Sequence, residues 1–177
     1  MDEKREQSLE TWRRQIGEYF ASWASQVVLV YLFGSWAAGR AWAQSDLDLG
    51  VLFDPALPPR TRWKLTLRFE VDLVGLLEGV GEVDVRELNA APLAFRYQVI
   101  RHQQCLYARS EAERVAFEAR LITDYCDFKP VRDHYYRYMA ERLRRGDVGY
   151  GLTSRRRLVA PRSPASAAGP SPGATRD

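Results

Sequence analysis

The sequence of 177 residues lacks the features that mark several protein classes. Its only two cysteines, Cys105 and Cys126, are far apart and form no CxxC pair, which argues against a disulfide framework and a metal clip. The longest apolar run, Val27 to Phe33, has seven residues and is too short to cross a bilayer. The first residues are charged throughout, so no signal peptide is expected. These absences predict a cytoplasmic protein that does not contact a membrane.

A basic excess is also missing from most of the chain. The formal net charge is +3, but residues 151–177 hold five arginines and one aspartate. Residues 1–150 hold 21 basic and 22 acidic side chains and are nearly neutral. A domain that binds nucleic acid along its length usually carries an excess of basic residues. We therefore expect no direct contact between this body and nucleic acid.

The C-terminal segment has almost no large apolar side chains. From Ala160 to Ala174 every residue except Arg162 is Pro, Ala, Ser or Gly. Such a segment cannot bury enough apolar surface to offset the entropy lost on ordering. We therefore expect one domain over residues 1–146, with C-terminal helices from about residue 110, and a disordered tail over residues 147–177.

Helices and short strands alternate in the body. Apolar residues at three- and four-residue steps predict a helix over about residues 6–25. The uninterrupted apolar run 27–33 is typical of a strand buried on both faces. The remaining pattern predicts strands over 47–53 and 82–88, a helix over 92–101 and an edge strand at 105–107. The sequence thus predicts an α/β (α+β) fold with a small sheet flanked by helices.

Two segments need a choice between structures. Residues 61–79 alternate as in a strand, yet they also contain a helical stripe, and a strand of that length would be exceptional, so we predict a helix. Ser110 and Glu113 have the spacing of a capping box and open a helix. Pro130 should end or kink this helix. A last helix is then expected to run to about Arg145. The helical stripe of residues 61–79 consists of Trp63, Leu67, Val71, Val74 and Leu77.

One motif carries the chemistry of the sequence. The buried strand runs into Gly34-Ser35, and ten residues later Asp46-x-Asp48 opens the next strand. Residues two apart in a strand point to the same face, so both carboxylates project together. Asp84 lies on the polar face of a third strand and could complete a trio. Each part alone is common at turns, but the combination favours a functional site.

Three carboxylates in one place need a counter-charge. Two unit charges 4 Å apart repel by about 4 kcal/mol at an effective dielectric of 20. Oxygen ligands suit Mg²⁺ or Mn²⁺, which commonly bind together with substrate phosphates. Gly34 lets the backbone approach a phosphate closely, and Ser35 adds a hydroxyl donor. Arg40 and Ser45 are candidates for further phosphate contacts.

This motif resembles the signature of the nucleotidyltransferase superfamily that includes DNA polymerase β, and the short chain resembles its minimal nucleotidyltransferase (MNT) branch. Later segments extend the resemblance over about residues 10–145, and the last of them is similar to the C-terminal helix of MntA-type antitoxins. These segments are Val83-Asp84-Val85, Leu88-Asn89-x-x-Pro92, Leu106-Tyr107 and Asp124-Tyr125-x-Asp127-Phe128-Lys129-Pro130. Arg86 departs from the pattern, because a smaller or apolar residue is expected there.

The resemblance implies a mixed sheet with flanking helices, Mg²⁺-bound ATP and release of pyrophosphate. Gly34 and Ser35 would hold the triphosphate, and Asp46 and Asp48 would bind two Mg²⁺ ions. Asp84 would bind one of these ions and act as the base toward the incoming hydroxyl. MntA-type members adenylylate a tyrosine of a HEPN-domain ribonuclease toxin, so the resemblance implies an antitoxin that forms a hetero-oligomer with such a toxin.

Two alternatives stay open. The first is a binding-only antitoxin that masks a HEPN toxin by contact. The second is nucleotidyl transfer to a small molecule, as in aminoglycoside nucleotidyltransferases. Retention of all three acids favours catalysis over masking, while the absence of a clear extra domain favours a protein acceptor.

Overall fold

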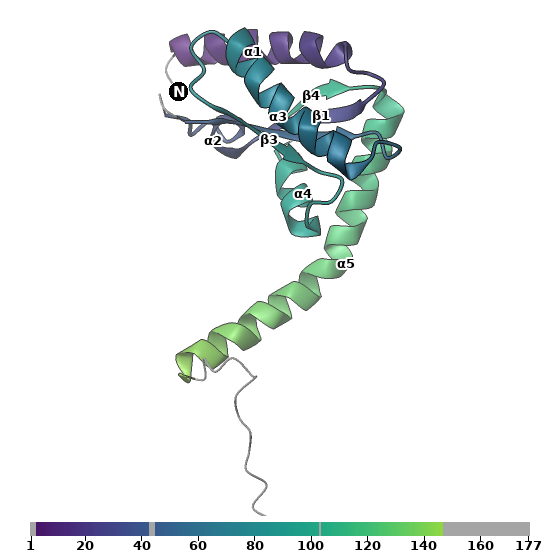
Figure 1. The fold of residues 1–177 in the computed structure, drawn as a ribbon. Helices are drawn as coiled ribbons and strands as arrows, with labels where there is room; N and C mark the ends of the chain where they lie inside the picture. Colours follow the sequence, from purple (N-terminus) through teal and green to yellow (C-terminus); the bar gives the residue numbers. More distant parts are fainter. Residues whose placement is uncertain (1–2, 43–44, 103, 147–177) are drawn as a thin grey trace, which may run out of the picture. The chain divides into compact units, whose positions relative to one another are not determined.

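The computed structural model describes residues 3–42, 45–102 and 104–146 (Figure 1). The chain divides into two units, residues up to 135 and residues from 136 onward. The expected tail over residues 147–177 lies outside the described residues. Within the described part, no helix has both the length and the apolar composition needed to cross a membrane.

A four-stranded mixed sheet forms the centre of the first unit, with strand order β3-β2-β1-β4. Strand β1 pairs antiparallel with both β2 and β4, whereas β2 and β3 are parallel. The predicted strands are all present, and the first two have the predicted bounds. The strands are β1 (Val27–Phe33), β2 (Leu47–Phe53), β3 (Val83–Glu87) and β4 (Cys105–Ala108).

Helices connect and flank these strands (Figure 1). The expected fold class, a small mixed sheet with flanking helices, is therefore confirmed. The helices are α1 (Glu3–Ala21), α2 (Gly34–Ala37), α3 (Pro59–Leu76), α4 (Leu93–Ile100) and α5 (Glu111–Arg144).

Helices α1 and α3 share one hydrophobic core with the sheet. The apolar stripe predicted for the first helix is buried at Leu9, Trp12, Ile16 and Phe20. The Phe20 ring packs edge-on against Phe69 of α3, with ring centroids 5.0 Å apart. Burial of this stripe explains why a segment with many charged residues forms a stable helix.

Helix α3 is present as predicted, but of the stripe that predicted it only Leu77 is buried, and the other four residues are exposed. Trp63 is 61% exposed and Val71 is 73% exposed. The core instead receives Phe69 and Leu73, with Leu65 packed beside them. Both sets of residues have helical spacing, so the sequence alone does not say which one meets the sheet.

The other core cluster joins β1 to α4 and α5. Leu29 and Tyr31 of β1 pack with Val99 of α4 and Leu121 of α5. The Tyr31 hydroxyl also donates a hydrogen bond of 2.8 Å to Glu118 on α5. Because side chains of β1 enter both clusters, the prediction that this strand is buried on both faces is confirmed.

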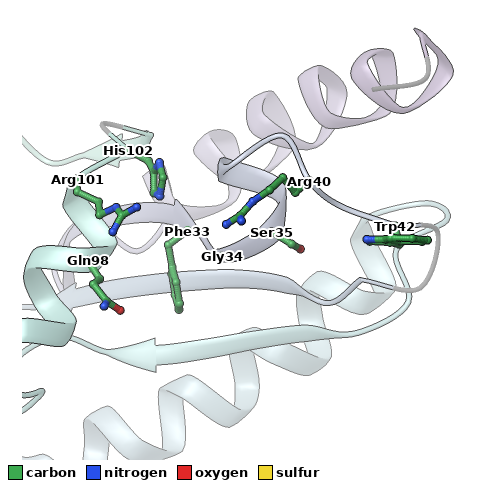
Figure 2. A pocket seen from close by; sticks show the side chains of 8 residues that line it. All are labelled: Phe33, Gly34, Ser35, Arg40, Trp42, Gln98, Arg101 and His102. Atoms are coloured by element: carbon green, nitrogen blue, oxygen red, sulfur yellow. The ribbon is translucent and has the colours of Figure 1, made fainter. Parts of the chain in front are cut away.

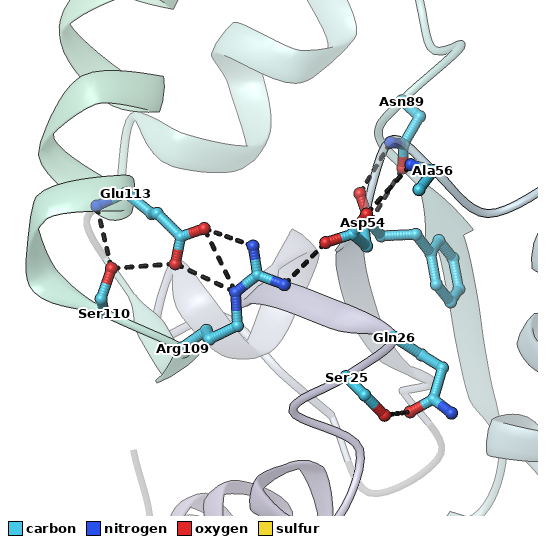
Figure 3. A network of polar contacts seen from close by, with 9 residues as sticks. Ser25, Gln26, Asp54, Ala56, Asn89, Arg109, Ser110 and Glu113 are labelled. Atoms are coloured by element: carbon cyan, nitrogen blue, oxygen red, sulfur yellow. Dashed lines mark hydrogen bonds and ion pairs between the residues drawn. The ribbon is translucent and has the colours of Figure 1, made fainter.

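The start of α5 is fixed by a polar network, which Figure 3 shows. The Ser110 hydroxyl donates to the Glu113 carboxylate at 2.8 Å, and the Glu113 amide donates back at 3.3 Å, as expected for a capping pair. Arg109 forms an ion pair with Glu113 and another, of 2.7 Å, with Asp54 after β2. Hydrogen bonds with Arg109 hold the pKa values of both carboxyl groups below their usual range. The network ties α5 to the end of β2.

The prediction that two helices follow Ser110 is wrong. Helix α5 runs from Glu111 to Arg144 with Pro130 inside it. Proline removes one backbone donor, but the helix continues on both sides of it. The ion pair between Lys129 and Asp133, with an N–O distance of 3.2 Å, spans one turn around the proline and supports this continuity.

Candidate active site

The centre of the candidate site is the corner where β1 ends and α2 begins. Gly34 has a φ of +70°, in the left-handed region that favours glycine. A Cβ atom at this position would lie 1.9 Å from the Asp48 Oδ2 atom. Phe33 pairs with Asp48 across the β1–β2 ladder, which explains this closeness. The glycine predicted to approach a phosphate therefore also leaves room for a carboxylate.

Asp48 and Asp84 come from neighbouring parallel strands. They are partners in the β2–β3 register. Their leucine and valine neighbours, Leu47, Leu49 and Val85, are buried, so the two carboxylates lie on the side of each strand away from these core residues. The sheet thus brings together two acids that are far apart in the sequence.

Asp46 lies just before β2 and is exposed, whereas Asp48 is half-buried. Burial raises the pKa of Asp48, and the negative charges of Asp84 and Asp46 raise it further, while Arg86 partly offsets them. Asp48 is therefore the acid of the predicted trio that combines burial with repulsion from the other two.

Arg86 is the counter-charge of this acidic group. Its Nε and Nη2 atoms donate to the Asp84 Oδ2 atom at 2.8 and 2.7 Å. Within the residues that the structure describes, no three His, Cys, Asp or Glu side chains are arranged so that they could hold a metal ion. Arg86, the departure seen in the sequence, therefore supplies the positive charge beside Asp84.

The acidic side of the site opens into a hollow of about 420 Å³. Phe33 forms one wall, and its ring packs edge-on against Phe95 of α4 with centroids 5.5 Å apart. The carboxylates of Asp48 and Asp84 line this hollow together with Arg86. The acids are thus accessible to a ligand.

A second and larger cavity, of about 640 Å³, shares Phe33 with the acidic hollow (Figure 2). Gly34, Ser35 and Arg40 line it. The Arg40 amide donates to the Ser35 carbonyl at 2.9 Å, so the loop after α2 returns Arg40 to the Gly-Ser corner. Three of the predicted phosphate-binding residues therefore meet in one cavity.

Ser45, the remaining predicted contact, has a role within the loop. Its hydroxyl accepts a hydrogen bond of 2.8 Å from the Trp42 amide, and its carbonyl accepts one of 3.1 Å from the Trp36 indole. Ser45 is not among the residues that line the two hollows. Its contact with phosphate stays a prediction.

The two tryptophans near the site differ sharply. Trp36 is buried and packs edge-on against Trp12, with ring centroids 5.1 Å apart. Trp42 is 78% exposed and lines the larger cavity. Only Trp42 is therefore accessible for stacking against a ligand.

The sequence-based reasoning missed the residues that α4 contributes to the larger cavity. Gln98, Arg101 and His102 line it opposite Arg40 (Figure 2). The sequence signal that could have identified these residues was the short edge strand β4 after α4, because its pairing with β1 returns the chain to the Gly-Ser corner.

A comparison with protein families finds that the model for polymerase β nucleotidyltransferases matches residues 14–112. This range is more than half of the chain, and it contains all three acids and the Gly-Ser corner.

Comparisons with individual proteins point in the same direction. The chain is similar to the protein adenylyltransferase MntA of Shewanella oneidensis, with 29% identity over 97 residues, which are 55% of this chain and 65% of that relative. The match therefore spans less than two thirds of the relative's length.

Solved structures share the fold at lower identity. One is a crystal structure of a toxin–antitoxin with AMP-PNP, with a TM-score of 0.56, 23% identity, and coverage of 72% of this chain and 98% of that chain. Another is a tri-AMPylated Shewanella oneidensis HEPN toxin in complex with an MNT antitoxin, with a TM-score of 0.53, 22% identity, and coverage of 74% and 98%.

Proposed function

Because the chain belongs to the polymerase β nucleotidyltransferase family, we propose that it transfers AMP from ATP to a HEPN-domain toxin and thereby acts as its antitoxin. The observation that carries this proposal is the packing of the Asp48 carboxylate against Gly34, with Asp84 in register beside it. This arrangement joins a phosphate-binding corner to a pair of acids. The acceptor is inferred from the similar proteins, one of which is an adenylyltransferase and one of which is complexed with an AMPylated toxin.

The donor set fits Mg²⁺ in its chemistry. Asp46, Asp48 and Asp84 offer only oxygen ligands, which Mg²⁺ prefers. Burial raises the pKa of Asp48, and the negative charges of Asp84 and Asp46 raise it further, a repulsion that bound cations would relieve. Two Mg²⁺ ions would be held by these three residues and would supply positive charge beside the triphosphate.

The residues of this chain would then position the reaction. Gly34 and Ser35 hold the triphosphate, with Arg40 as its counter-charge. A tyrosine oxygen of the toxin forms a bond to the α-phosphorus, and the bond from this phosphorus to the bridging oxygen breaks, so that pyrophosphate leaves with the electron pair. Arg86 contacts the Oδ2 atom of Asp84, so we assign the Oδ1 atom as the acceptor of the tyrosine proton.

The test is the mass of the toxin after incubation with this chain, ATP and Mg²⁺. We expect an increase by one or more AMP units, and a hetero-oligomer of chain and toxin in size-exclusion chromatography. The double variant Asp46→Ala/Asp48→Ala should abolish the increase. Glu78→Gln removes an exposed carboxylate outside the site and serves as the control. An unchanged toxin mass with the intact chain would refute the transfer.

One observation favours a second candidate, a binding-only antitoxin. Arg86 holds the Asp84 carboxylate, and the described acids do not form a ready metal site. On this candidate, the double variant Asp46→Ala/Asp48→Ala silences the toxin as well as the intact chain does, while the toxin mass stays constant. The same reaction mixtures therefore separate the two candidates when toxin ribonuclease activity is measured beside its mass.

A further inference from the structure

The larger cavity has two walls of different origin (Figure 2). One wall is the Gly-Ser corner with Arg40. The other is the C-terminal end of α4, where Arg101 and His102 face the same space. The function proposed above uses only the first wall.

Both arginines of this cavity lack a counter-charge. Among the residues that the structure describes, neither the Arg40 nor the Arg101 side chain has an ion pair or hydrogen bond. By contrast, Arg86 is paired with Asp84, and Arg109 is paired with Asp54 and Glu113. Two guanidinium groups on one cavity repel each other, so an anion that enters between them gains attraction from both.

The backbone that carries Arg101 is firmly held. Val99 and Ile100 are buried directly before it, and the Arg101 amide donates to the Tyr97 carbonyl at 3.0 Å. After it, the Leu32 amide of β1 donates to the Gln104 carbonyl at 2.9 Å. Arg101 is therefore fixed close to the end of β1, while its exposed side chain stays free to adjust.

We propose that Arg101 is a nucleotide-binding residue that grips the two terminal phosphates of a nucleoside triphosphate opposite Arg40. The inference rests on the proposed function, because that function places the α-phosphate at Asp48 and Asp84. The two phosphates beyond it then extend past Gly34 and Ser35 into the larger cavity. A planar guanidinium binds a phosphate through two parallel hydrogen bonds, which suits Arg101 to this role. His102 adds a weaker donor on the same side.

This assignment makes Arg101 selective for the leaving group. It would recognise ATP and free pyrophosphate, but not AMP, whose single phosphate stays at the acidic side. The bonds that form and break in the AMP transfer stay as described above. Arg101 acts by binding the pyrophosphate portion before and after the transfer.

The test is the affinity of purified variants for Mg²⁺-ATP, pyrophosphate and AMP, measured by calorimetry. A hydrogen-bonded charge is lost in Arg101→Ala, so we expect affinity for ATP and pyrophosphate to fall about ten- to hundredfold. Affinity for AMP should stay unchanged. Arg101→Lys should restore part of the loss, because lysine returns the charge without the planar fork.

Arg60→Ala is the matched control, since it removes an exposed arginine of α3 that lines neither hollow. Its affinities should equal those of the intact chain, and both variants should melt at the same temperature as the intact chain. If Arg101→Ala binds ATP and pyrophosphate as tightly as the intact chain, the proposal is overturned while the proposed function stands. If pyrophosphate binding depends on Arg101 but no AMP is transferred to the toxin, the phosphate-binding role of Arg101 stands and the proposed function fails. If the intact chain binds neither ligand, both are overturned.

Discussion

The two hollows that share Phe33 are built in different ways. The acidic one takes Asp48 and Asp84 from paired strands, where the register sets their separation. The basic one takes Arg40 and Arg101 from a loop and a helix end, and both side chains are exposed. Groups that act on reacting atoms need accurate placement, whereas long arginines reach a phosphate from several backbone positions. On the proposed function, the rigid part of the fold would hold the reacting end of the substrate, and the adaptable part would hold its terminal phosphates.

The largest expected effect comes from filling the space between Gly34 and the Asp48 carboxylate. Gly34→Ala places a methyl group against the Asp48 carboxylate and also strains the backbone at its positive φ. We expect AMP transfer to fall by about a hundredfold or more, and stability to fall by about 1–2 kcal/mol. Gly39→Ala has the same positive φ of +66° but no atom within 4 Å of the added Cβ. It should therefore lose similar stability and keep most of the activity.

Transfer rates and melting curves of both variants check this prediction. Equal activity in the two alanine variants would mean that the contact with Asp48 has no functional meaning, and the separation into two hollows would lose its chemical basis.

A smaller effect is expected from removing the counter-charge of the acidic hollow. Arg86→Ala frees the Asp84 carboxylate, so we expect Mg²⁺ to bind about three- to fivefold more tightly. Arg68→Ala breaks an ion pair with Asp72 of closely similar exposure, 61% and 34% against 60% and 33%, and is the control. The rise of the melting temperature during a Mg²⁺ titration measures the difference. A weaker response in Arg86→Ala than in Arg68→Ala would contradict competition between Arg86 and the cation.

The smallest effect concerns the pH dependence of stability. Burial and the negative charges of Asp84 and Asp46 hold the folded-state pKa of Asp48 above its usual value of 3.8, so the fold loses stability as the pH rises from 3.8 through the folded-state pKa and does not regain it at higher pH. Asp48→Asn should therefore raise the free energy of unfolding at pH 7, by an amount that solvent screening keeps small. This gain should vanish as the pH falls below the usual aspartate pKa.

Denaturant titrations at several pH values without Mg²⁺ check this last prediction, with Glu78→Gln as the control. A gain that persists at low pH would show that charge repulsion is not its origin, and the acidic hollow would then differ from the basic one in shape alone.

Local signals predicted the strands and the acidic side of the site well. The bounds of β1 and β2 agree with the sequence because apolar runs ending at glycine or proline are strong local markers. Asp48 lies on β2 and Asp84 on the predicted third strand, β3, and the alternating pattern placed both acids on polar strand faces. The sequence did not predict the ion pair between Arg86 and Asp84, because the partner of an arginine is decided by the side-chain geometry of the folded state.

Other features depend on contacts that local patterns do not contain. The helical stripe with Trp63 and Val71 predicted α3, yet Phe69 and Leu73 face the core, since the sheet and α1 decide which periodic set is covered. The contribution of Arg101 to the cavity likewise depends on the pairing of β4 with β1. The prediction that a separate helix follows Pro130 was wrong, because the helix continues through the proline and the ion pair between Lys129 and Asp133 spans it.

The parallel pairing of β2 with β3 also has a consequence during protein synthesis. Parallel neighbours require a crossover, and here α3 must be made and packed before Asp84 can reach Asp48. A ribosome-bound chain that ends before β3 thus holds the Gly-Ser corner and two acids but no proton acceptor. On the proposed mechanism, such a nascent chain cannot transfer AMP from ATP. The onset of transfer activity therefore shows that β2, α3 and β3 have folded together.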